Sequence, residues 1–262
     1  MEKRAMGDVN KVDKKQFSGV VYSKFSEVPK EVVVDCFGID PVIEGMSSKC
    51  QWYAQRSTQE EVTAKMTTLI NLLSCREKIS VLDYGGGVGQ FFFSVEKYLT
   101  FYNTVTWQVL DTEPMIRVAK EKIKGKDNLF FYKDLQGVRD ADLVFFRQSL
   151  QVLEDPAKIL ADIVRLFTPK IIFLSGVPAG KNEDYVGLVL SCGEENKGCP
   201  CWIFNEGKLL NTVSRLGYFL LDKFNENITI NLSNFHDEFQ MDDEQKNHAK
   251  GYIFLREGAV KV

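Results

Sequence analysis

The chain has 262 residues, 44% of them hydrophobic and 26% charged, so it is long enough to bury a sizeable core without disulfide staples. Its 33 lysines and arginines against 36 acidic residues give a formal charge of −3, which offers no excess positive charge for nucleic acid or an anionic membrane. The charged first 15 residues do not resemble a signal peptide, and no apolar run reaches the about 18–20 residues of a membrane span, so we expect a soluble, cytoplasmic protein without membrane insertion.

The first 74 residues are expected to precede the main domain. Residues 1–16 are polar and lysine-rich, which predicts a flexible tail. Residues 17–74 are expected to form an N-terminal helical extension, which opens with a short apolar stretch at 17–22. Its clearest helix lies between 51 and 73, where Val62, Met66 and Leu69 begin an apolar stripe at helical spacing.

From residue 75 to 262 short apolar runs alternate with helical patterns. Strands are expected at 79–83, 106–111, 129–132, 143–146, 171–174, 218–224 and 251–256. Helices are expected at about 91–99, 114–124 and 156–167. Only a crossover of helical length can return the chain in the same direction, so this alternation predicts parallel pairing. The fold class is therefore α/β, a doubly wound, mostly parallel seven-stranded sheet.

Two segments interrupt this alternation. Residues 177–205 are glycine-rich and 225–250 are polar, and both are expected to be irregular. In a parallel sheet both would follow carboxyl ends of strands, which is the edge where open α/β sheets bind ligands. We expect them to form the substrate pocket together with the N-terminal region.

Metal chemistry is not indicated by the cysteines and histidines. Cys199 and Cys201 are the only close cysteine pair, and His236 and His248 are the only histidines. A zinc site needs a second pair or histidines at matching spacing. Reduced thiols and no metal are expected.

The most informative stretch is the glycine-rich turn after the first strand of this domain, from Asp83 to Gly89. Glycines at 85, 87 and 89 allow a tight turn and close approach of a ligand to the backbone. The amide groups of the turn and the start of the next helix favour an anionic group. A structural turn without a ligand is the alternative interpretation.

The spacing of these glycines separates classes of nucleotide site. A dinucleotide fingerprint needs Gly-x-Gly-x-x-Gly, but the sixth position is Gln90 when counted from Gly85 and Phe92 when counted from Gly87. The Gly-Lys-Ser/Thr of a phosphate-binding P-loop is absent. An acidic-x-Gly-x-Gly-x-Gly pattern is present from Asp83 through Gly89.

That pattern resembles the first motif of the Rossmann-like (class I) S-adenosylmethionine-dependent methyltransferases. In the resemblance, Asp111 at the end of the second strand accepts hydrogen bonds from the ribose, since a vicinal diol offers two donors and a carboxylate has two acceptor oxygens. Pro114 opens the following helix, Asp134 and Leu135 match the adenine region, and residues 148–156 match the segment that closes over the methionine portion.

A narrower resemblance is to methyltransferases associated with bacterial surface-polysaccharide biosynthesis. It is carried by residues 17–23, 82–89, 148–153 and 199–202. The polysaccharide association comes from this resemblance alone. It implies a saccharide or another small molecule as methyl acceptor.

The resemblance implies S-adenosylmethionine as cofactor. The residues expected to contact it are Asp83, Tyr84, Gly85, Gly86, Gly87, Gly89, Gln90, Asp111, Thr112, Met115, Asp134, Leu135, Gln148 and Ser149. Asp111 has an alternative role as a helix cap, Asp134 as a solvated loop residue, and Gln148 and Ser149 as a strand end.

Catalytic residues are less well marked. His236 is the candidate general base, because histidine titrates in the useful range and this one follows the sixth strand; an exposed loop histidine is the alternative. Asp184 and Tyr185 compete for the role. Residues 52–56, with Arg56 as a partner for the cofactor carboxylate, are a candidate lid or a plain surface helix.

The expected reaction is methyl transfer to a hydroxyl or amino group of a small polar acceptor, such as a sugar or glycan precursor. A non-catalytic S-adenosylmethionine-binding protein and a nucleotide-sugar or dinucleotide enzyme are the rival hypotheses.

Overall fold

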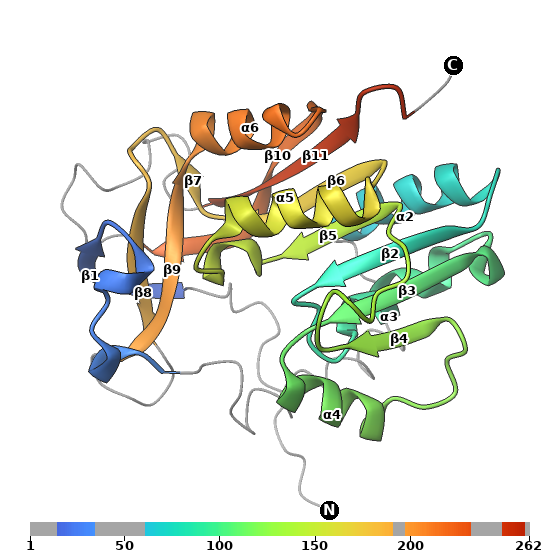
Figure 1. Cartoon of the computed structure of the whole chain (residues 1–262), viewed down its shortest axis with the longest axis horizontal. Coiled ribbons are helices and arrows are strands. Elements are labelled where there is room, and N and C mark those ends of the chain that lie inside the picture. Colours follow the sequence, from blue (N-terminus) through green and yellow to red (C-terminus); the bar gives the residue numbers. More distant parts are fainter. Residues whose placement is uncertain (1–14, 35–60, 191–196, 232–247, 260–262) are drawn as a thin grey trace, which may run out of the picture.

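The structure is a computed structural model, and it describes residues 15–34, 61–190, 197–231 and 248–259. The strands are β1 (Lys15–Tyr22), β2 (Ile79–Tyr84), β3 (Val105–Leu110), β4 (Leu129–Tyr132), β5 (Leu143–Arg147), β6 (Ile171–Val177), β7 (Ala179–Gly180), β8 (Tyr185–Leu190), β9 (Gly198–Asn205), β10 (Tyr218–Asn231) and β11 (His248–Arg256) (Figure 1). The α-helices are α2 (Glu61–Ser74), α3 (Gln90–Val95), α4 (Glu113–Lys122), α5 (Pro156–Phe167) and α6 (Glu206–Arg215). Short 3-10 helices are η1 (Phe25–Glu27), η2 (Lys30–Val32), η3 (Glu96–Tyr98), η4 (Tyr102–Thr104) and η5 (Leu150–Val152). No helix in these ranges combines the length and apolarity needed to cross a membrane.

Seven strands form the sheet expected from the sequence, in the order β4-β3-β2-β5-β6-β11-β10. Strands β4, β3, β2, β5 and β6 pair in parallel, and β11 is antiparallel to both β6 and β10. Helices α3, α4 and α5 connect β2 to β3, β3 to β4 and β5 to β6, because parallel neighbours need a crossover connection. The prediction of a doubly wound, mostly parallel seven-stranded sheet is confirmed.

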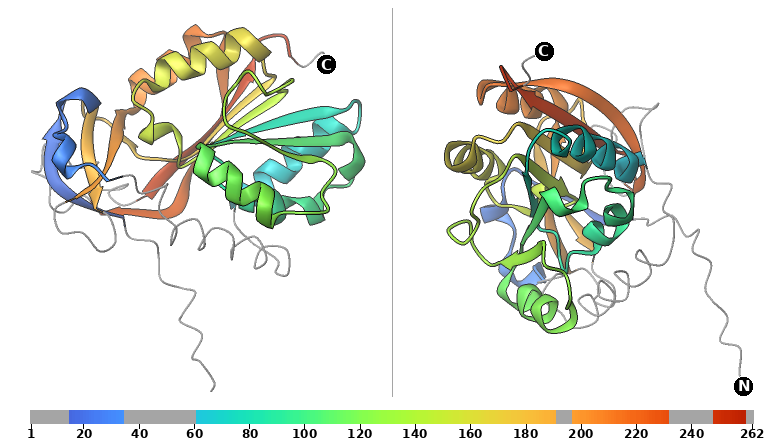
Figure 2. Two further views of the ribbon diagram at one scale, coloured as in Figure 1. Left: turned by 60° about the horizontal axis from the view of Figure 1, so that its bottom comes forward. Right: turned by 90° about the vertical axis from the view of Figure 1, so that its right-hand side faces the viewer.

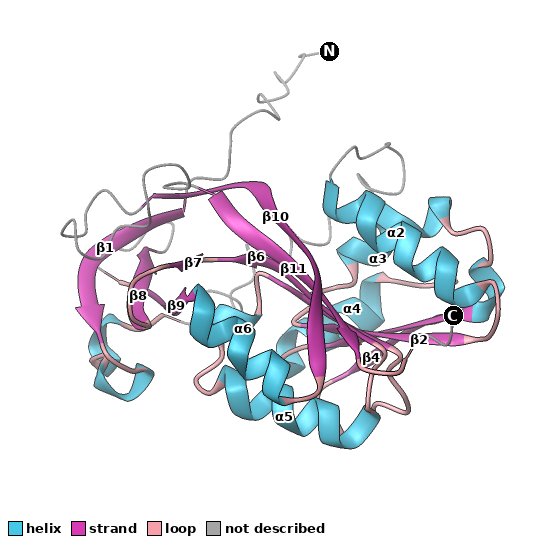
Figure 3. Ribbon diagram, turned by 90° about the horizontal axis from the view of Figure 1, so that it is seen from above, coloured by secondary structure: helices cyan, strands magenta, loops and turns pink. Residues whose placement is uncertain are grey.

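Helices cover both faces of this sheet. Along β5, Leu143 and Phe145 pack in one core cluster with α2, α3 and α4, whereas Val144 and Phe146 pack in a second cluster with α5 and α6. Successive side chains of a strand point to opposite faces, so a strand buried on both sides is apolar throughout. Figure 3 shows α2 and α3 on one side of the sheet and α5 and α6 on the other.

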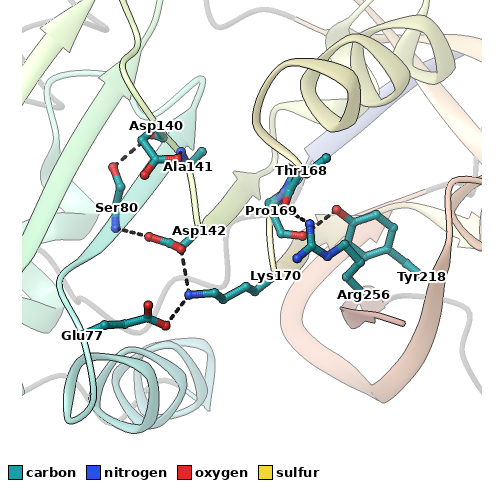
Figure 4. A network of polar contacts seen from close by, with 10 residues as sticks. All are labelled: Glu77, Ser80, Asp140, Ala141, Asp142, Thr168, Pro169, Lys170, Tyr218 and Arg256. Atoms are coloured by element: carbon teal, nitrogen blue, oxygen red, sulfur yellow. Dashed lines mark hydrogen bonds and ion pairs between the residues drawn. The ribbon is translucent and has the colours of Figure 1, made fainter. Parts of the chain in front are cut away.

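The amino edge of the sheet is held by a polar network (Figure 4). Lys170 forms ion pairs with Glu77 and, at 3.0 Å, with Asp142. The second Asp142 carboxylate oxygen accepts a hydrogen bond from the Ser80 amide at 2.9 Å. The Tyr218 hydroxyl donates to the Pro169 carbonyl at 2.6 Å. These contacts lie at the starts of β2, β5, β6 and β10, which leaves the carboxyl edge for a ligand.

The sheet continues beyond β10 into strands that the sequence analysis missed. The order there is β10-β1-β8-β9-β7, with β8 antiparallel to both β1 and β9. In Figure 2 these strands curve away from the parallel part of the sheet. Two expectations are therefore wrong: the extension at 17–74 is not helical at its start but opens with β1, and the segment 177–205 is not irregular but contains β7, β8 and β9.

The ends of two further expected segments also differ. Strand β10 runs to Asn231 and β11 begins at His248, so both ends of the supposedly irregular 225–250 are extended. Lys15 and Gln16 of the expected tail belong to β1, which pairs with β10. Residues 1–14 and 35–60 lie outside the described residues.

Candidate functional site

The glycine-rich turn connects β2 to α3 at the carboxyl edge of the sheet. Gly85, Gly87 and Gly89 have φ values of 72°, 61° and 81°, in the left-handed region that disfavours other residues. A Cβ atom at Gly85 would lie 2.4 Å from Ser149 Cβ, so a side chain there would collide with the segment after β5. The amides of Gly85, Gly87 and Gly89 are hydrogen-bonded within the chain, so an anionic ligand would need other donors of the turn.

Asp111 follows β3 and holds this turn in place. One carboxylate oxygen accepts a hydrogen bond from the Gly87 amide at 2.8 Å, and the other accepts one from the Thr112 amide at 2.7 Å. Each carboxylate oxygen can accept a second hydrogen bond. Asp111 therefore fits the position expected for a ribose-binding carboxylate while it also shapes the glycine turn.

Asp83, the last-but-one residue of β2, is buried, with 1% of its surface exposed. Its Oδ2 accepts a hydrogen bond from the Trp107 indole at 3.2 Å, and its Oδ1 has no hydrogen-bond partner within the described part of the chain. Burial raises the pKa of Asp83 to about 7; Asp111 adds to the rise, and the Trp107 hydrogen bond and Arg147 oppose it. A buried acceptor without a partner is costly, which marks this position as a candidate for function.

Gln148 and Ser149 lie directly beside the turn. The Ser149 hydroxyl donates to the Tyr84 carbonyl at 2.5 Å, and the Tyr84 ring stacks on Phe146 with centroids 4.9 Å apart. Gln148 has a φ of 56°, although it is not glycine. Strained residues of this kind cluster at functional sites.

The remaining predicted contacts lie around the ends of β2, β3 and β4. Thr112 is exposed at the start of α4, and Met115 is buried in the core cluster of α2, α3 and α4. Asp134 accepts the Gly137 amide at 3.1 Å, which supports its alternative role in a local turn, and Leu135 packs against the opposite core cluster.

Gln90, at the start of α3, has a buried side-chain oxygen without a hydrogen-bond partner among the residues described. This unsatisfied acceptor lies directly after the glycine turn. Within the turn, a Cβ at Gly86 would come within 2.5 Å of Asp83 Cγ, so the backbone passes close over that buried carboxyl group. The chain thus offers unsatisfied acceptors on both sides of the turn, at Asp83 and Gln90.

A second polar group at this edge was missed by the sequence analysis. Gly176, in β6 with φ 69°, donates its amide to the buried Glu226 carboxylate at 2.6 Å and accepts a hydrogen bond from Gln151 at 3.1 Å. The Ser175 hydroxyl also donates to Glu226, at 3.1 Å. Glu226 lies 50 residues from Gly176, so no local pattern could reveal the contact.

The structure describes only some of the residues that the sequence analysis considered as general bases or as a lid. His236 and residues 52–56, including Trp52, Tyr53 and Arg56, lie outside the described residues. Tyr185 is buried in an apolar cluster of β1, β8 and β9, where burial raises its pKa. Asp184 accepts the Asn205 amide at 2.6 Å and so supports the end of β9. No cluster of three potential metal ligands occurs among residues 15–34, 61–190, 197–231 and 248–259.

A sizeable cavity in the described part of the chain lies away from the glycine turn. It has a volume of about 600 Å³ and lies between η1, the start of α5, β9 and α6. We assign the nucleotide site by the geometry of the turn instead, because that edge carries the strained backbone and the unsatisfied acceptors. The cavity is a separate feature.

Comparisons with known proteins bear on the fold. No protein-family profile matches the chain, and no curated protein matches its sequence. A chain in the complex between the Haloferax volcanii Trm112 methyltransferase activator and the putative methyltransferase has 16% identity and a TM-score of 0.54, over 87% of this chain and 99% of that one.

Other similar structures match less well. Magnesium protoporphyrin IX methyltransferase from Synechocystis PCC 6803 with bound S-adenosylmethionine has 13% identity and a TM-score of 0.48, over 75% of this chain and 78% of that one. A putative sarcosine dimethylglycine methyltransferase from Galdieria sulphuraria has 12% identity and a TM-score of 0.49, over 77% of this chain and 85% of that one. The match with a TM-score of 0.54 shows that the chain has a Rossmann-like methyltransferase fold.

Proposed function

We propose that the chain is an S-adenosylmethionine-dependent methyltransferase that modifies a hydroxyl or amino group of a small polar acceptor, such as a sugar. The observation that supports this most is the pairing of Asp111 with the glycine turn: its carboxylate accepts the Gly87 amide at 2.8 Å. A dinucleotide site is disfavoured by the glycine spacing. The polysaccharide association rests only on the resemblance of short motifs.

The side chains present fit this cofactor chemically. Two buried acceptors without partners in the described chain, on Asp83 and Gln90, flank the turn and suit a ligand that brings N–H donors and positive charge. Asp111, which directly follows β3, is a carboxylate of the kind that accepts hydrogen bonds from a ribose diol. Leu135, which is partly buried, supplies apolar surface near the end of β4, whereas Met115 is buried in the core cluster of α2, α3 and α4.

The chemistry divides between cofactor and protein. S-adenosylmethionine, when bound, supplies a methyl group activated by a sulfonium charge. The protein's part is to align the acceptor and exclude water. The buried contacts of Glu226 and Gln151 with Gly176 keep the ends of β5 and β6 rigid for that purpose. An amine that arrives deprotonated needs no base, and a hydroxyl needs one, for which His236 stays our candidate.

Calorimetric titration tests the cofactor assignment. S-adenosylmethionine and S-adenosylhomocysteine should bind, and NAD should not. Asp111→Ala should weaken binding by about 10- to 100-fold, the value of one or two charge-assisted hydrogen bonds. Gly87→Val should weaken it at least as much, because Gly87 has a φ of 61°. Asp127→Ala, an exposed aspartate away from the turn, is the matched control.

Two outcomes would count against the proposal. Unchanged affinity in both folded variants, checked by circular dichroism, would remove the site assignment. Tight cofactor binding without conversion to S-adenosylhomocysteine across a broad acceptor panel would favour the non-catalytic alternative.

A further inference from the structure

The cavity of about 600 Å³ has the size of a small-molecule site, and its lining includes Glu154, Asp155 and Pro156 from the far end of the segment that begins beside the glycine turn, but no residue of the turn itself. We call it the aromatic pocket. Its walls include Phe25, Glu154, Ala157, Asp184, Trp202 and Phe204. In Figure 1 the start of α5, β9 and α6 converge on this region.

Three aromatic rings form a row in the wall of the aromatic pocket. Phe25 and Trp202 have centroids 5.6 Å apart and ring planes inclined by 35°, and Trp202 and Phe204 have centroids 6.4 Å apart and planes inclined by 24°. The Trp202 indole donates to the Leu153 carbonyl at 3.0 Å, which fixes the ring. The Trp202 and Phe204 rings are stacked and the Phe25 ring is tilted against Trp202, so the three together present an apolar aromatic surface to another ring.

The pocket carries both acceptors and donors: three carboxylates, on Glu154, Asp155 and Asp184, the amines of Lys24 and Lys208, and the hydroxyls of Ser26 and Thr212. Asp155 already accepts a hydrogen bond from the Lys158 amide, and Asp184 accepts one from the Asn205 amide. Lys208 is already paired with Glu183 and, at 3.7 Å, with Asp184. Carboxylates can only accept hydrogen bonds, so a matching ligand must carry donors. Glu154 is exposed, and unlike Asp155 and Asp184 its carboxylate has no hydrogen bond to a backbone amide among the contacts of the described chain.

We propose that the aromatic pocket is a second ligand site, for a ring compound with one apolar face and hydroxyl or amino donors at its edge. The apolar face lies on the Phe25–Trp202–Phe204 row, and the donors face Glu154 and its neighbouring carboxylates. Both a hydroxylated or aminated aromatic ring and an amino sugar have this chemistry. The site does not depend on the proposed methyl transfer.

Ligand-observed NMR titrations of the whole chain test this inference with four probes. Tyramine and glucosamine have a ring with edge donors, whereas anisole has a ring without donors and putrescine has donors without a ring. We expect tyramine, glucosamine or both to bind, and anisole and putrescine to bind at least about tenfold more weakly because each lacks half of the recognition.

Two substitutions locate the binding. Ala157 is an exposed residue of α5 that lines the pocket, so Ala157→Phe should fill it and weaken binding about tenfold or more. Lys158→Phe, one residue further and outside the lining, is the matched control and should change affinity less than about twofold. Glu154→Gln should weaken tyramine about two- to fivefold, the effect of one exposed charge pair.

The inference fails if neither tyramine nor glucosamine binds, or if anisole or putrescine binds as tightly as they do. It also fails if Ala157→Phe leaves their affinity unchanged. S-adenosylhomocysteine binding, measured by calorimetry on the same variants, should stay constant. If it is absent even in the original chain while the ring compounds still bind, the proposed methyl transfer is wrong and the aromatic pocket stands.

Discussion

Asp83→Asn should make the stability of this protein less dependent on pH. The Asp83 carboxyl is buried with Trp107 as its hydrogen-bond donor, and burial raises its pKa from 3.8 to about 7. The folded chain therefore holds this proton more tightly than the unfolded chain. As pH falls through 7 towards 4, the folded state takes up a proton that the unfolded state does not, so this group favours folding increasingly at lower pH.

The size of the effect follows from the two pKa values. The Asp83 pKa is 3.8 in the unfolded chain and about 7 in the folded chain, a difference that corresponds to about 4 kcal/mol of stability. This stabilisation is lost progressively as the pH rises from about 4, and it is gone above pH 7. About 2 to 3 kcal/mol of this falls between pH 5 and 8, where most other carboxylates stay ionised. The asparagine side chain of the variant would keep an acceptor for the Trp107 indole without a charge to bury.

Urea unfolding of both proteins at pH 5, 6, 7 and 8, without cofactor, measures the difference. The free energy of unfolding of Asp83→Asn minus that of the original chain should rise by about 2 to 3 kcal/mol from pH 5 to pH 8. Asp127→Asn makes the same chemical change at an exposed position and should show no such trend. A difference that stays within about 0.5 kcal/mol at every pH would refute the buried-carboxylate argument.

Three further substitutions test the backbone and the sheet edge by thermal unfolding. Thr168→Gly should stabilise the chain by up to about 1 kcal/mol, because Thr168 ends α5 with a φ of 45°; a lower melting temperature would contradict this. Gly176→Ala should destabilise it by about 2 kcal/mol or more, because the new Cβ would lie 2.4 Å from Gln148 Cγ, and an unchanged melting temperature would show that Gln148 can move aside. Tyr218→Phe should cost about 1 to 2 kcal/mol, since the buried Pro169 carbonyl loses its donor at 2.6 Å; no loss would mean that water replaces the hydroxyl.

The parallel part of the fold was predictable because its strands are buried on both faces. Such strands read as short continuous apolar runs, as in Leu143 to Phe146, and their helices carry clear apolar stripes. The glycine turn and Asp111 were predictable for a similar reason. Their roles depend on a few residues adjacent in sequence, at the ends of neighbouring strands.

The strands beyond β10 were not predictable from the same signals. Gly187, Gly198 and Pro200 interrupt β8 and β9 and resemble loop residues, yet Leu188 pairs with Pro200 in the antiparallel ladder. At Gly198 a Cβ would come within 2.2 Å of the Val189 carbonyl oxygen, so the glycine serves close strand pairing rather than a turn. Tertiary pairing with β1 decides the structure here.

Glu226 likewise could not be recognised from the sequence as part of the candidate site. Nothing in residues 225–231 marks a functional carboxylate, because its contacts with Ser175 and Gly176 arise only where β10 crosses the end of β6. Contacts of such sequence separation follow from the complete fold. The sequence could locate the edge at which a ligand binds, but not the groups that distant strands bring to it.

The raised pKa of Asp83 also has a consequence for the proposed cofactor. S-adenosylmethionine carries a sulfonium and an ammonium group beside one carboxylate, a net charge of about +1 near neutral pH, and nearby positive charge lowers the pKa of a carboxyl. A carboxyl with a pKa of about 7 in the empty protein would then release a proton when the cofactor binds near neutral pH. An unpaired buried carboxylate is unfavourable for folding, but it gives a cationic ligand a partner that water cannot screen. On this reasoning, we expect the buried Asp83 carboxyl to favour a positively charged nucleoside over an anionic dinucleotide.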